Sequence, residues 1–112
     1  MKHVTVEGKE MIVGDEVADA LTAYAAAIAK IGSGDRVDVR AFSTTGDETT
    51  VTVVFTAATS IVAETVHSSM AEPDNTEATA YLREHTDAIM SPLSVLPESS
   101  DEQAWNTEMD EG

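Results

Sequence analysis

The chain has 112 residues, no cysteine, and 21 acidic against 6 basic side chains, which gives a formal net charge of −15 at pH 7. This length suits one domain with a modest core, and the lack of cysteine excludes disulfide scaffolds, thiolate zinc sites and cysteine nucleophiles. The charge argues against direct binding to nucleic acid or to anionic membranes, because both depend on Lys and Arg meeting phosphates. The sequence has no signal-peptide core and no apolar run of membrane-spanning length, so we expect a cytoplasmic protein.

Alternating polar and apolar residues near the N-terminus predict a β-hairpin. Residues 3–7 and 10–13 form its two extended runs. We expect Gly8 and Lys9 at the turn, because a type II′ turn requires a positive φ at its first central residue and glycine adopts one without strain.

The clearest helix signal covers residues 15–31. Asp15 is predicted to cap the N-terminus, and Glu16 adds negative charge at the positive end of the helix dipole. Gly32 supplies the stop. Apolar residues recur every three or four positions and predict one buried stripe. The stripe consists of Val17, Leu21, Tyr24, Ile28 and Ile31.

A second hairpin is predicted from residues 36–43 and 49–56, which are joined by turn-forming residues. Its apolar residues alternate with charged residues and threonines, so one face is expected to be buried and the threonine-rich face solvated. Residues 61–66 are predicted to form a fifth strand.

A second helix is predicted to start after Asp74, which has Glu77 three residues later in the spacing of a capping box. Pro92 ends this helix, because the residue before a proline avoids the helical region. Its apolar stripe consists of Ala78, Tyr81, Leu82, His85 and Ile89.

Together these elements predict an α+β fold in which a mainly antiparallel sheet of four to five strands is packed by two helices. The domain is expected to span residues 1–96. Residues 97–112 are predicted to form an acidic C-terminal tail, either disordered or docked, because so few apolar residues cannot offset the entropy of ordering the segment.

Side chains suited to catalysis or metal binding do not form a recognisable pattern. His3, His67 and His85 lack zinc-binding spacing. Asp15, Glu16 and Asp19 share the first turns of a helix, where negative charge serves the helix dipole without a cation. The sequence therefore predicts no catalytic residue, no metal and no cofactor, and hence a protein that is not an enzyme.

Trp105 lies in the acidic tail, four residues before Met109, and has no evident structural role in the predicted fold. If this segment became helical, the two side chains would share a face, with Glu102 and Glu108 supplying charge. These four residues are the predicted binding site for a protein partner. The alternatives are that Trp105 folds back onto its own domain or that it has no role.

The leading functional prediction is a non-enzymatic protein-interaction module that binds a basic or groove-bearing protein, with homodimerisation left open. One alternative is an acidic nucleic-acid mimic or antitoxin-like inhibitor of a nucleic-acid-binding protein. The other is a small-ligand-binding domain or enzyme with a pocket near His67 or His85.

Overall fold

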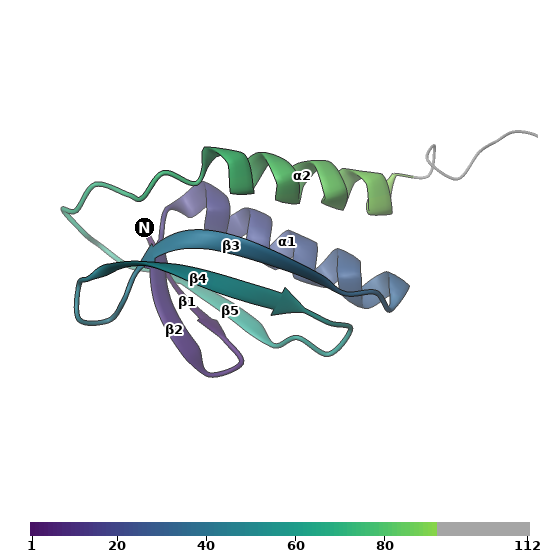
Figure 1. Ribbon diagram of the computed structural model, residues 1–112, viewed down its shortest axis with the longest axis horizontal. Helices are drawn as coiled ribbons and strands as arrows, with labels where there is room; N and C mark the ends of the chain where they lie inside the picture. The colour runs from purple at the N-terminus through teal and green to yellow at the C-terminus, as the bar shows by residue number, and fades with distance from the viewer. Residues whose placement is uncertain (92–112) are drawn as a thin grey trace, which may run out of the picture.

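The computed structural model describes residues 1–91 and has the predicted α+β architecture. Five strands form one antiparallel sheet in the order β4-β3-β2-β1-β5, and the two helices lie side by side against it (Figure 1). The strands are β1 (Lys2–Val6), β2 (Lys9–Val13), β3 (Asp35–Phe42), β4 (Glu48–Phe55) and β5 (Ile61–Thr65). The helices are α1 (Asp15–Ile31) and α2 (Thr76–Met90). Neither helix is both long and apolar enough to cross a membrane.

Strands β1 and β2 form the predicted hairpin, but the prediction of its turn is wrong by one residue. Val6 pairs with Lys9, so the two central residues of the turn are Glu7 and Gly8. Both have positive φ angles, 48° and 84°. The turn is therefore of type I′ rather than type II′, and its twist matches that of the flanking strands.

Helix α1 supplies much of the core. Four residues of its predicted stripe are at most 3% exposed, namely Val17, Leu21, Tyr24 and Ile28. They pack in one cluster with the inward-facing residues of β1 to β4 and with Leu82 of α2. Ile31 is 54% exposed, so the prediction that it belongs to the stripe is wrong. The helix ends there, because Gly32 adopts the left-handed conformation and its N–H binds the carbonyl of Ile28.

Neither predicted side-chain cap forms. The N-cap of α1 is Gly14, and the carboxylate of Asp15 instead lies 3.0 Å from the N-terminal ammonium group. The N-cap of α2 is Asn75, again without a side-chain cap bond. Asp74 accepts hydrogen bonds from the backbone N–H and the hydroxyl of Thr76, at 3.0 and 2.7 Å, which makes a local turn ahead of the helix.

The sheet is divided into two parts that barely pair with each other. Strands β3 and β4 pair along their full length, and β1 lies between β2 and β5. Between β2 and β3, the described residues pair only at Ile12 and Phe42. Beyond this pair, β3 has α2 beside it in place of another strand (Figure 1). Within residues 1–91, most of one edge of β3 therefore has no neighbouring strand.

Substituting Gly32 with alanine should destabilise the fold, because a side chain at φ 62° is strained. We expect the free energy of unfolding, measured by urea denaturation, to fall by about 1–2 kcal/mol. The neighbouring exposed residue Ser33 has no positive φ and provides the control. Ser33→Ala should change the stability by less than about 0.5 kcal/mol. Equal effects of the two substitutions would contradict this account of the helix end.

Candidate functional site

A groove of about 810 Å³ lies between the open edge of β3 and the first half of α2. Residues 36–38 and Arg40 line its strand side, and residues 74–78 and Tyr81 line its helix side. We call it the β3–α2 groove. Two other hollows in residues 1–91 are smaller, and the β3–α2 groove has a strand edge as one wall. For these two reasons it is the candidate functional site.

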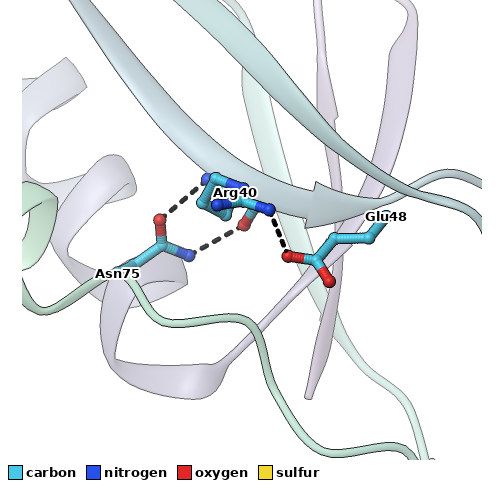
Figure 2. A network of polar contacts seen from close by, with 3 residues as sticks. All are labelled: Arg40, Glu48 and Asn75. Carbon is cyan, nitrogen blue, oxygen red and sulfur yellow. Dashed lines mark hydrogen bonds and ion pairs between the residues drawn. The ribbon is translucent and has the colours of Figure 1, made fainter.

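One end of the β3–α2 groove is closed by the side chain of Asn75. The backbone N–H of Arg40 donates to Asn75 Oδ1, and Asn75 Nδ2 donates to the carbonyl of Arg40, both at 2.8 Å (Figure 2). Residues directly opposite each other in an antiparallel ladder exchange the same two bonds. The carboxamide of Asn75 therefore takes the place of one residue of a neighbouring strand.

This contact also fixes the direction of the other backbone groups along β3. The N–H and carbonyl of Arg40 point away from β4. Because backbone groups alternate in direction along an antiparallel strand, those of Arg36 and Asp38 also point away from β4. The N–H of Arg36 binds Asp35 Oδ1 at 2.6 Å. The carbonyl of Arg36 and both backbone groups of Asp38 therefore face the groove with no strand beside them in residues 1–91.

At the Tyr81 end of the groove, a carboxylate of β3 joins both helices to this strand. Asp35 Oδ2 accepts hydrogen bonds from the hydroxyl of Tyr24 in α1 and from that of Tyr81 in α2, the latter at 2.6 Å. His85 stacks on the ring of Tyr81 with 3.9 Å between ring centroids, and the ring of Tyr24 meets that of Phe55 edge to face at 5.1 Å. This cluster sets the position of α2 beside β3.

The hydrogen bonds of the cluster shift the protonation equilibria of its members. Burial, followed by the bond to Asp35, raises the pKa of Tyr24. The bond to Asp35, followed by desolvation, raises the pKa of Tyr81. Burial would raise the pKa of Asp35, but the bonds from Tyr24, Tyr81 and the N–H of Arg36 outweigh it and hold this pKa below its ordinary value. Asp35 therefore stays ionised as the acceptor, and the hydroxyls of Tyr24 and Tyr81 stay protonated as donors.

The strand side of the groove carries charges of alternating sign on the solvent face of β3. Arg40 binds Glu48 at 2.6 Å (Figure 2). Arg36 has no ion pair within residues 1–91. Asp38 accepts a hydrogen bond from the hydroxyl of Thr52 at 2.6 Å, and it too has no cationic partner in the described chain. Two opposite charges two residues apart are thus available to a ligand.

The sequence predicts four partner-binding residues in the acidic tail. Trp105, Met109, Glu102 and Glu108 fall outside the described residues. His85 belongs to the tyrosine cluster. These predictions for the tail stay predictions.

Neither histidine of the predicted ligand pocket lines one of the described hollows. His67 lies in the loop between β5 and α2, and the smaller hollows, of about 490 and 220 Å³, lie beside the start of α1 and between β4 and the first hairpin. Within residues 1–91 no group of three or more His, Cys, Asp or Glu side chains is arranged to hold a metal ion.

Comparisons with protein-family models, with curated proteins and with solved structures give no match for this chain. A role is therefore inferred from the geometry of the groove.

The residues that form the groove gave only weak signals in the sequence. Asn75 lay beside the predicted helix start, where an amide side chain is expected to cap the helix. Tyr24 and Tyr81 were predicted as members of the apolar stripes of the two helices. Tyr24 is buried, whereas Tyr81 is 37% exposed. A lone aspartate at the start of a strand gave no sign that it would meet both hydroxyls.

Replacing Asp35 with asparagine should destabilise the fold at neutral pH, since the tyrosine hydroxyls lose a charged acceptor. We expect a loss of about 1–3 kcal/mol in urea denaturation at about pH 7. Because the folded-state pKa of Asp35 is lowered, its stabilising contribution exists above the unfolded-state pKa and disappears as the pH falls through the folded-state value. The difference between wild type and Asp35→Asn should therefore shrink on acidification.

The exposed carboxylate of Asp87 on the same helix as Tyr81 provides the control for net charge. Asp87→Asn should have a small effect on stability at neutral pH. A stability difference for Asp35→Asn that does not depend on pH would contradict the assignment of Asp35 as the ionised acceptor.

Replacing Asn75 with alanine should release the backbone of Arg40. We expect faster hydrogen exchange at the Arg40 amide and a loss of about 1–2 kcal/mol of stability, as two hydrogen bonds are removed. Asn75→Asp keeps an acceptor for the Arg40 N–H and should protect this amide better than alanine does. Unchanged exchange at Arg40 in Asn75→Ala, measured by NMR, would contradict the pairing.

Proposed function

We propose that this protein is a non-enzymatic protein-interaction module that binds an extended segment of a partner protein as an additional strand on β3. The observation that carries this proposal is the contact between Asn75 and Arg40, in which a side-chain amide occupies the place of a strand residue. Strand addition of this kind obtains affinity from main-chain hydrogen bonds and specificity from alternate side chains.

The dimensions of the β3–α2 groove suit such a ligand. Its volume of about 810 Å³ lies within the range found for ligand-binding sites. The edge of β3 from Asp35, which binds Tyr81, to Arg40, which binds Asn75, spans about 17 Å at the usual rise per strand residue. A short extended segment that enters from solvent therefore fits better than a long strand.

The class of function is the one that the sequence predicts, but the proposed surface is different. The sequence pointed to Trp105 and its neighbours as a segment that inserts into a partner. The groove instead receives a segment from the partner. The two proposals concern different parts of the chain, because residues 97–112 follow α2 in the sequence and the groove lies along the first half of α2.

Selection from a library of random peptides of about ten residues should yield ligands that pair with β3. On binding, the Asp38 amide should become protected from hydrogen exchange. Methylating the peptide nitrogens one at a time should weaken binding at alternate residues, because every second N–H of an added antiparallel strand faces β3. Each sensitive position should lose about tenfold in affinity, measured by fluorescence anisotropy.

Two proline variants provide a matched comparison on the protein side. Asp38 and Thr52 face each other across β3 and β4, and both N–H groups point outward, Asp38 to the groove edge and Thr52 to the far edge of β4. Asp38→Pro should abolish peptide binding and Thr52→Pro should leave it, although both remove the Asp38–Thr52 hydrogen bond. Failure to select any peptide, or equal binding by both variants, would contradict the proposal.

A further inference from the structure

Given strand addition at β3, which is itself proposed above, we infer that the groove selects segments with the order basic, apolar, acidic from N- to C-terminus. The basic residue pairs with Asp38, the apolar residue enters the groove opposite Val37, and the acidic residue pairs with Arg36.

The antiparallel direction follows from the contacts already made on this edge. All strand pairs of the sheet are antiparallel. Asn75 and Arg40 exchange the two bonds that mark a directly opposed antiparallel pair. A ligand residue opposite Asp38 repeats this arrangement two residues along, and the following residues of the ligand lie opposite Val37 and then Arg36.

Charge complementarity then assigns the outer two residues of the ligand. Side chains directly opposite each other in an antiparallel pair project on the same face and lie close together. Arg36 and Asp38 are exposed on the solvent face and lack ion-pair partners in residues 1–91. An acidic side chain opposite Arg36 and a basic one opposite Asp38 supply the missing partners, whereas the reversed order places like charges together.

The middle residue of the ligand is assigned from the core-facing side of β3. Val37 points toward the core and is 7% exposed. A ligand side chain opposite it projects to the same side, where Ala78 and Tyr81 line the helix wall of the groove. An apolar side chain fits this position because it replaces water against apolar surface.

A partner segment fits this edge better than a second copy of the chain. The sequence Arg36-Val37-Asp38 itself has the order basic, apolar, acidic, so two copies of β3 could in principle pair around a two-fold axis. However, β3 has eight residues and pairs with β4 on its other edge, while Asn75 and Tyr81 close the groove at both ends. A short segment enters the groove without displacing either closure.

The test compares two peptides of identical composition, acetyl-Thr-Thr-Lys-Val-Glu-Thr-Thr-amide and its charge-reversed form acetyl-Thr-Thr-Glu-Val-Lys-Thr-Thr-amide. Titration followed by NMR should show that the wild-type protein binds the first about tenfold more tightly than the second. The double variant Arg36→Glu/Asp38→Lys should reverse this preference. Rising salt should reduce the difference, since exposed charge pairs are screened.

The outcomes separate this inference from the proposed function. Equal binding of both peptides, with Asp38 amide protection retained, would overturn the charge order and leave strand addition intact. If neither peptide binds and library selection also fails, both are wrong. A dimer in sedimentation equilibrium that Asp38→Pro, but not Thr52→Pro, converts to a monomer would overturn the inference in favour of a second copy. Reversal of preference in the double variant would establish the charge order.

Discussion

The carboxylate of Asp35 accepts a hydrogen bond from a tyrosine hydroxyl of each helix, and the position of α2 beside the sheet depends on this contact. Tyr24 is already fixed in the core, so the bond to Tyr81 holds α2 at a set distance from the start of β3. At the other end of the groove, Asn75 sets the distance by binding the backbone of Arg40. The helix is thereby held beside the strand edge at two points, and the space between them is the groove.

The fold could be predicted from the sequence because its elements are marked locally. The alternation in β3 and β4 and the stripe of α1 each reflect a single buried face, and Val37, Val53 and Leu21 lie where the periodicity placed them. The helix starts were less predictable, since Asp15 and Asp74 had other partners nearby. An aspartate can bind the chain terminus or its own turn as readily as a helix end, and these choices depend on tertiary neighbours.

The candidate site could not be predicted, because its members are far apart in the sequence and chemically ordinary. Asn75 and Arg40 are separated by 35 residues, and Tyr81 and Asp35 by 46. Their roles arise because, in the described part of the chain, β3 pairs with β2 only at Ile12 and Phe42 and the rest of this edge stays open. Nothing in the pattern of either strand indicates that the ladder stops there. An open strand edge is a property of topology, and local periodicity does not encode topology.

The position of α2 has a further consequence for the behaviour of the chain at high concentration. An unpaired strand edge can template association with the edges of other copies, which leads to aggregation. Here α2 covers the open edge of β3 on one side. The closed ends of the β3–α2 groove leave room for only a short segment. The same placement that creates the β3–α2 groove thus limits the size of any segment that can pair with β3. The groove has room for a short extended segment and none for a preformed sheet.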